Sequence, residues 1–172
     1  MAAGKTNSAF WRFSLTLYAK PGVAPTCLAL QDQWGVDVNL LFFLAFLASH
    51  GRCLNVAEVR QIDDFIRPWR EHVVWPLRSV RRALKNGVAP VSAGISGKLR
   101  DAIKREELHA ERQQQQALEQ RFPPETTGLA ANPDSALHAN LDAYQELIGK
   151  PTGAIPVLPW GDFLAATLQV ST

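Results

Sequence analysis

The 172-residue chain has few of the features that mark secreted and membrane proteins. It contains only two cysteines, Cys27 and Cys53, whose spacing matches no metal site, so we expect free thiols in a reducing compartment. The most apolar stretch, residues 40–48, is about half the length that a helix needs to cross a bilayer. The first residues lack the continuous apolar core of a signal peptide. We therefore predict a cytoplasmic protein with no membrane insertion.

Catalytic and cofactor-binding motifs are also missing. The sequence has no Gly-x-Ser-x-Gly elbow, and residues 94–98 lack the complete phosphate-loop pattern. Glu106 and His109 have the Glu-x-x-His spacing of a di-metal bundle, but such a site requires a second copy of the motif. The sequence therefore predicts no catalytic residue, no metal ligand and no cofactor, and it leaves the existence of an enzymatic activity open.

What the chain does contain is an ordinary globular composition with an uneven charge distribution. Hydrophobic residues make up 47% and charged residues 20%, as expected for one folded domain, and the net charge is +2. Residues 67–86 carry six cationic side chains against Glu71 alone. Residues 122–172 carry Lys150 against five acidic side chains. The basic middle and the acidic C-terminal region can therefore pair in the fold.

Capping residues and apolar spacing predict three helices before residue 51. Ser8 is a suitable N-cap for the first helix, and Pro25 suits the first turn of the second. Asp37 can cap a third helix, from Val38 to about Ser49, which is apolar nearly all round and must be surrounded by other helices. We therefore predict an all-α fold: a single-domain helical bundle of about six helices around this apolar central helix.

Residues 55–86 form the most amphipathic segment. Its apolar residues recur every three or four positions and fall within one sector of a helical wheel, while its arginines fall in a separate sector. Pro68 and Pro76 each remove an internal hydrogen bond, so the segment is either one amphipathic helix or two stacked helices. We expect its apolar side to pack against the central helix and its guanidinium groups to face water. The apolar residues are Val59, Ile62, Ile66, Trp69, Val73, Leu77, Val80 and Leu84.

The second half of the chain is more polar. Residues 88–97 have the composition of a loop, and the polar helix that follows either packs by one narrow stripe or extends beyond the core. A further helix is expected from Pro133 to Ile148, a short one around Trp160, and no strand pair. The predicted single helical domain, residues 1–172, thus has core helices in 8–86, the long polar helix in 98–121, and an acidic C-terminal extension with one or two helices in 122–172.

Two blocks of the sequence carry a resemblance to a known family. The first comprises Phe10-Trp11-Arg12-Phe13-Ser14, Leu17-Tyr18, Cys27-Leu28-Ala29-Leu30-Gln31-Asp32 and Gly35-Val36-Asp37-Val38-Asn39-Leu40-Leu41. The second comprises Trp69-Arg70, Val74, Pro76-Leu77-Arg78 and Arg81-Arg82. In these blocks the chain resembles a family of small uncharacterised proteobacterial proteins, catalogued as a domain of unknown function. The resemblance covers roughly the first two-thirds of the chain. It implies a bacterial, cytosolic, helical protein and carries over no activity or catalytic residue.

The basic side of residues 55–86 is the best candidate for a functional surface. Guanidinium groups bind carboxylates and phosphates in a planar, bidentate manner. The surface therefore predicts a non-catalytic protein–protein interaction or a regulatory function with an acidic protein partner, unless its residues are only solvated or paired internally. The candidate partner-binding residues are Arg67, Arg70, Arg78, Arg81, Arg82 and Lys85.

Two other functions are compatible with the sequence. The same surface can bind a nucleic-acid backbone, although the low net charge and the lack of a helix-turn-helix pattern count against it. Alternatively, an enzyme or carrier can hold a small molecule inside the bundle, which requires polar side chains gathered in the core. The sequence fixes neither the partner nor the oligomeric state. The candidates for such a polar pocket are Gln31, Asp32, Asn39 and His72.

Overall fold

The computed structural model describes residues 8–149 and 166–167. Side-chain caps mark the starts of several of its helices. The side chains of Ser8 and Asp37 accept backbone hydrogen bonds at the starts of two helices, and Asn55 forms a capping box with Glu58 at a third. The elements in chain order are α1 (Ala9–Tyr18), α2 (Val23–Trp34), α3 (Val38–Ser49), β1 (Arg52–Cys53), α4 (Val56–Trp69), the π-helix η1 (Arg70–Val74), α5 (Trp75–Asn86), α6 (Ala93–Arg121), β2 (Leu129–Ala130) and α7 (Pro133–Leu147).

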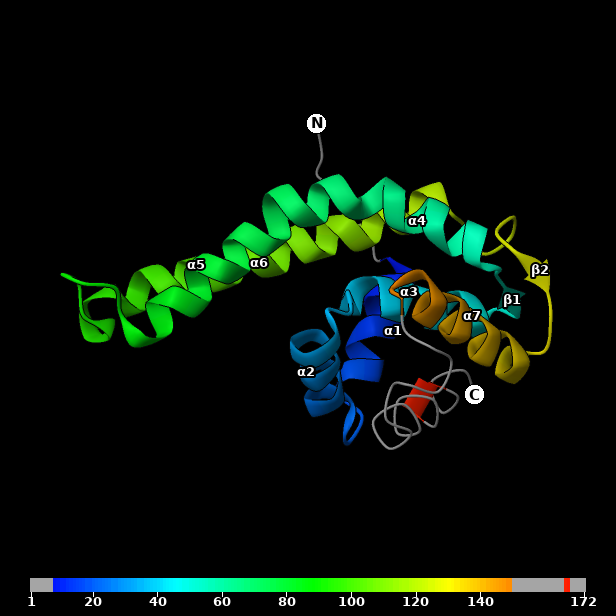
Figure 1. The fold of residues 1–172 in the computed structure, drawn as a ribbon, viewed down its shortest axis with the longest axis horizontal. Helices are drawn as coiled ribbons and strands as arrows, with labels where there is room; N and C mark the ends of the chain where they lie inside the picture. Colours follow the sequence, from blue (N-terminus) through cyan, green and yellow to red (C-terminus); the bar gives the residue numbers. More distant parts are fainter. Residues whose placement is uncertain (1–7, 150–165, 168–172) are drawn as a thin grey trace.

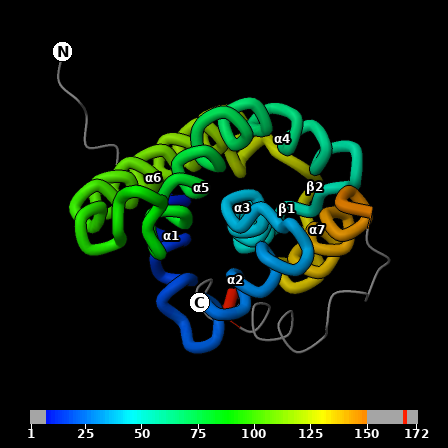
Figure 2. The backbone as a smooth tube through the Cα atoms, turned by 60° about the vertical axis from the view of Figure 1, so that its left-hand side comes forward, coloured from blue at the N-terminus to red at the C-terminus, as the bar shows by residue number. Residues whose placement is uncertain are grey.

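The apolar helix α3 lies at the centre of the bundle, as predicted. Ten of its twelve residues are buried, and the other helices surround it (Figure 2). The ring of Phe10 in α1 lies 5.0 Å from that of Phe43 and 5.3 Å from that of Phe46, measured between ring centres. On another side, α7 packs along α3. The all-α fold class is therefore confirmed, whereas the helix expected around Trp160 lies outside the described residues.

The structure also contains one pair of very short strands, contrary to the expectation of none. β1 pairs with β2 in an antiparallel manner. The buried side chain of Asn140 in α7 fixes the chain next to β1 by accepting a 2.7 Å hydrogen bond from the backbone N–H of Leu54. The same side chain donates to the backbone carbonyls of Leu44 (3.1 Å) and Arg52 (2.9 Å). Strands of two residues are too short to show an alternating sequence pattern, and tertiary contacts determine where they form. The sequence therefore could not predict this pair.

Residues 56–86 follow one continuous helical path, and the two prolines do not divide it into stacked helices (Figure 1). α4 runs directly into η1, and η1 runs into α5. Pro76 lies in the first turn of α5, directly after the π turn. A proline in an α-helix clashes with the preceding turn and lacks an N–H donor. The wider turn of a π-helix, with its i→i+5 hydrogen bonds, accommodates both. Pro68 is accommodated inside α4.

The first part of this long helix contributes side chains to the core, whereas α5 does not. Val59, Ile62 and Ile66 are buried in the core, whereas α5 contains no buried residue. The expectation that the whole apolar side packs on the central helix is therefore wrong. α5 packs along α6 instead, and the two helices project beyond the body as an antiparallel pair (Figure 1). We call this projection, residues 75–105, the arm. Because α6 begins at Ala93 rather than at residue 98, only the short turn 87–92 joins the two helices.

Candidate functional site

Arg70, the first residue of η1, is buried in an ion-pair network close to the start of the arm. Its Nη1 donates to Oδ1 of Asp63 (2.7 Å) and to Oδ2 of Asp37 (3.0 Å), and only 8% of its side chain is exposed. Its guanidinium carbon lies 5.3 Å from the centre of the Trp75 ring. The expectation that this guanidinium faces water is therefore wrong. A helical wheel gives the direction of a side chain but not the residue of another helix that lies opposite.

Asp63 shares its carboxylate between Arg70 and Arg67. Nη2 of Arg67 donates to Oδ2 of Asp63 (2.8 Å) and also contacts the carboxylate of Asp64. Burial opposes ionisation of Asp63, but the hydrogen bonds and charges of Arg70 and Arg67 outweigh it, so its pKa lies below its usual value. The Arg67 side chain is 41% exposed, so its ion pairs are surface pairs that contribute little stability.

Acid is expected to destabilise the protein partly through Asp63. Because the pKa of Asp63 is lower in the folded state, the unfolded state binds more protons between the two pKa values. The contribution of Asp63 is therefore complete at neutral pH and is lost as the pH falls below about 4. Urea unfolding at a series of pH values should show a shallower acid decline for Asp63→Asn than for the wild type. If the unfolding free energies of the two proteins fell in parallel with decreasing pH, Asp63 would not contribute to the acid sensitivity.

Glu107 of α6 binds the first two arginines of α5. Its carboxylate accepts a hydrogen bond from Nε of Arg78 (2.9 Å) and two from Arg81, of which the one from Nη2 measures 3.1 Å. Burial opposes ionisation of Glu107, but these two arginines outweigh it and hold its pKa below the usual value. Arg78 also donates to Glu111 and, at 2.7 Å, to Oε1 of Gln31 in α2. Both guanidinium groups are therefore engaged within the fold.

Arg82 and Lys85 lie farther along α5 and are more exposed. Arg82 donates to Oδ1 of Asp32 in α2 at 2.8 Å, with about half of each side chain exposed. A cleft of about 330 Å³ lies beside this pair, lined by residues of α2, the turn that follows it and α5. Lys85 forms no ion pair with a described residue.

Among the described residues, no carboxylate of 122–149 meets these arginines. In the part of the chain that the structure describes, the carboxylates that do meet them come from α2, from the N-cap of α3, and from α4 and α6. Of the six candidate partner-binding residues, Arg70, Arg78 and Arg81 are thus largely engaged in internal ion pairs, and Arg67 and Arg82 in more exposed ones.

The four side chains suggested for an internal polar pocket do not come together. Gln31 and Asp32 line the cleft beside α5. Asn39 is buried elsewhere and accepts a 2.8 Å hydrogen bond from Nε2 of Gln115. His72 is exposed. A different set of polar side chains, Asp37, Asp63, Arg70, Gln114 and Tyr144, forms a connected cluster in the interior.

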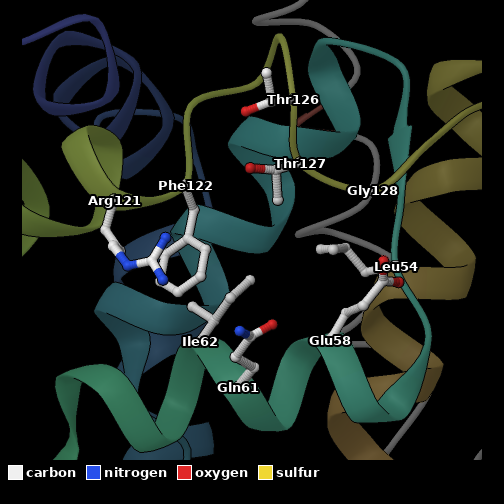
Figure 3. Close-up of a pocket in the computed structure, with 9 residues that line it drawn as sticks. All are labelled: Leu54, Glu58, Gln61, Ile62, Arg121, Phe122, Thr126, Thr127 and Gly128. Carbon is white, nitrogen blue, oxygen red and sulfur yellow. The ribbon is translucent and has the colours of Figure 1, made fainter.

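A second pocket, of about 200 Å³, lies between α4 and the loop that follows α6 (Figure 3). Ile62 and Phe122 form an apolar wall, and the guanidinium of Arg121 lies 5.2 Å from the centre of the Phe122 ring. Its volume is below the roughly 300–1,000 Å³ that is typical of ligand pockets. This pocket therefore indicates no substrate class. Elsewhere too, among the described residues, no group of three or more His, Cys, Asp or Glu side chains is placed to hold a metal ion.

The arm presents cationic and apolar side chains that the rest of the described fold does not cover. Ile95 is 77% exposed and Leu99 is 55% exposed. At about 100° per residue, these two residues fall on the same side of α6 as Lys98 and Arg105. Four exposed cationic side chains of the arm form no ion pair with a described residue, and we call them the arm cations. They are Lys85, Lys98, Lys104 and Arg105.

Sequence reasoning missed the three arm cations of α6, although a charge imbalance was visible. Residues 75–105 contain eight cationic side chains and one acidic side chain, Asp101. Glu106, Glu107 and Glu111 follow directly in the sequence, so the polar helix looks balanced in charge. The structure shows that Glu107 and Glu111 are engaged by arginines of α5, so among the described residues they form no ion pair with the arm cations.

Comparison with known proteins identifies a family. The family model described as "Protein of unknown function (DUF2390)" matches residues 9–118, a range that includes the whole arm. No curated protein and no solved structure matches the chain. None of the helices in the described residues combines the length and the apolar character needed to cross a membrane.

Proposed function

This chain belongs to the DUF2390 family of proteins of unknown function, as its sequence blocks implied, and on that premise we propose that it is a non-catalytic protein-interaction module. Its arm binds an acidic surface of a partner protein. The observation that supports this is the placement of Lys98 and Arg105, which form no ion pair with a described residue, on the same side of α6 as the exposed Ile95 and Leu99, on a projection that leaves the body. An acidic partner supplies the carboxylates that the arm cations lack, and contact with the two apolar residues supplies buried area.

The ion pairs inside the arm prepare it for binding. Glu107 links α5 to α6 through Arg78 and Arg81, so the arm is ordered before a partner arrives and loses less conformational entropy on docking. In this proposal the candidate partner-binding residues divide into two groups. Arg82 and Lys85 contact the partner directly, whereas Arg67, Arg70, Arg78 and Arg81 hold the arm in position.

Nucleic acid is the competing partner for the same cations. A phosphate backbone engages Lys98 and Arg105 but gives no apolar contact to Ile95 or Leu99, because phosphate contacts dominate sequence-independent binding. An acidic protein surface with apolar residues uses all four side chains. The grouping of apolar and cationic residues on one side of α6 therefore favours a protein partner.

The proposed setting is the bacterial cytoplasm. Cys27 is buried and Cys53 is partly buried, and both are free thiols. Free thiols are typical of reducing compartments, where disulfides rarely form. Binding should therefore be assayed in the presence of a reducing agent.

Reversing two arm cations is expected to reduce partner capture at least about tenfold, since rim and interface charges control association. The variant is Lys98→Glu/Arg105→Glu. The matched control is Arg12→Glu/Arg60→Glu, which changes the net charge equally at exposed positions of α1 and α4. Each protein is used as bait in a nuclease-treated bacterial lysate, and captured proteins are quantified by mass spectrometry. Equal capture by both variants would contradict the proposal, as would partners that disappear from the wild type after nuclease treatment.

A further inference from the structure

α7 carries a row of exposed, mainly acidic side chains on the part of the body away from the arm (Figure 1). Asp134, His138, Asp142 and Glu146 follow one another at intervals of four residues, and all four are exposed. Asp142 and Glu146 form no ion pair with a described residue. α7 contains neither lysine nor arginine. We call this row the acidic face.

A highly exposed apolar residue accompanies each of the two charged surfaces. Among the described residues, Ile95 (77%) and Leu129 (75%) are the most exposed large hydrophobic side chains. Ile95 lies on the arm beside Lys98, and Leu129 lies in β2, four residues before α7 begins. Single exposed apolar residues are common on protein surfaces. Here, however, Ile95 lies on the cationic surface, and Leu129 lies close in sequence to the acidic one. A contact between the two surfaces can therefore also include an apolar contact between Ile95 and Leu129.

The two surfaces also agree in length. The segment from Ile95 to Arg105 extends roughly 15 Å along α6, at 1.5 Å per residue. By the same measure, the acidic face from Asp134 to Glu146 extends roughly 18 Å along α7. Two helices of this length can lie side by side, with Ile95 near the Leu129 end and Arg105 near the Glu146 end. Lys98 and Arg105 then lie beside the acidic side chains of the face.

We propose that the acidic partner of the arm is a second copy of this chain, with the arm of one copy on the acidic face of the next. This rests on the proposed function and names its partner. Two copies that exchange arms reciprocally close into a two-fold symmetric pair. Without exchange the contact is heterologous, and its repetition gives a ring or an open chain. The assembly is sensitive to salt, since its charges lie at the protein surface.

Charge exchange between two full-length variants tests this contact. The arm variant is Lys98→Glu/Arg105→Glu, and the face variant is Asp142→Lys/Glu146→Lys. Light scattering coupled to size exclusion gives the mass of each sample at about 0.05 M and about 0.5 M salt. The wild type is expected to exceed the monomer mass of 19.0 kDa at low salt and to approach it at high salt. Each variant alone is expected to be a monomer, because its two surfaces then carry charge of the same sign.

Mixing the two variants gives the decisive measurement. The acidic arm of the arm variant then meets the cationic row of the face variant, and the cationic arm of the face variant meets the acidic face of the arm variant. An equimolar mixture is therefore expected to assemble again. Circular dichroism and urea unfolding of each variant show whether it is folded. A Leu129→Ser protein, which keeps all charges, is expected to weaken assembly at least about tenfold if the apolar contact is real.

Two results would overturn the inference: a monomeric wild type at low salt, or a mixture that stays monomeric. Each of these two results can be distinguished from a failure of the proposed function. If the wild type is monomeric but reversal of Lys98 and Arg105 still abolishes capture of a protein from the lysate, the arm binds a different acidic protein. If reversal changes neither assembly nor capture, the arm is not a binding surface and both proposals fail.

Discussion

Replacing Arg70 with methionine is expected to lower the free energy of unfolding by about 3–5 kcal/mol, the cost of removing one partner from a buried ion pair. Methionine fills much of the same space, but it leaves the buried carboxylate of Asp37 without a guanidinium and leaves Asp63 with only the more exposed Arg67. Asp37 also caps α3, so the loss affects the centre of the bundle as well as the start of the arm. Urea-induced unfolding, followed by circular dichroism at neutral pH, measures the change.

Two further variants show whether uncompensated charge is the cause. Arg67→Met removes an arginine that is 41% exposed and is expected to cost less than about 1 kcal/mol. The triple variant Arg70→Met/Asp37→Asn/Asp63→Asn removes the orphaned charges while asparagine still caps α3, and it is expected to recover much of the loss. Similar losses for Arg70→Met and Arg67→Met would show that the buried network does not contribute as described.

The helices and their order could be predicted from local sequence, because each depends on residues close together in the chain. Asp37 identifies the start of α3, and the run of apolar residues after it requires burial on all sides. Asn55 and Glu58 identify the start of α4 in the same way. The predicted helix from Pro133 is also present, because proline at the first helical position and apolar residues at intervals of three and four are both local signals.

The surroundings of the arginines could not be predicted, for two physical reasons. A wheel drawn at 100° per residue assumes one unbroken α-helix, whereas η1 has a wider turn and changes the phase of the residues that follow Arg70. In addition, the partners of Arg78 and Arg82 lie on α6 and α2, far away in sequence. The start of α6 was missed because Gly94 and Gly97 favour a loop locally, and packing against α5 overrides that preference.

The arm itself depends on polar contacts, which makes Glu107 the position where it can be loosened without unfolding the body. α5 has no buried residue, so apolar burial contributes little to holding it against α6. Glu107 provides one carboxylate for Arg78 and Arg81, and only 7% of its side chain is exposed. Removing it leaves Arg81 without an ion-pair partner among the described residues. Local opening of this kind can occur while the core stays folded.

Glu107→Ala is therefore expected to lower the free energy of local opening of α5 by about 2 kcal/mol, as expected for loss of hydrogen bonds to a charged group. Hydrogen–deuterium exchange should then be about 30-fold faster for the amides of α5, with the amides of α3 unchanged. Glu106→Ala is the matched control, because its neighbouring carboxylate is exposed and, among the described residues, forms an ion pair with His109 alone, and because the substitution changes helix propensity equally. Unchanged exchange in α5, or equal acceleration in α3, would show that Glu107 does not hold the arm. If it does, Glu107→Ala also weakens binding at Lys98 and Arg105, because a loosened arm must be ordered again before it can dock.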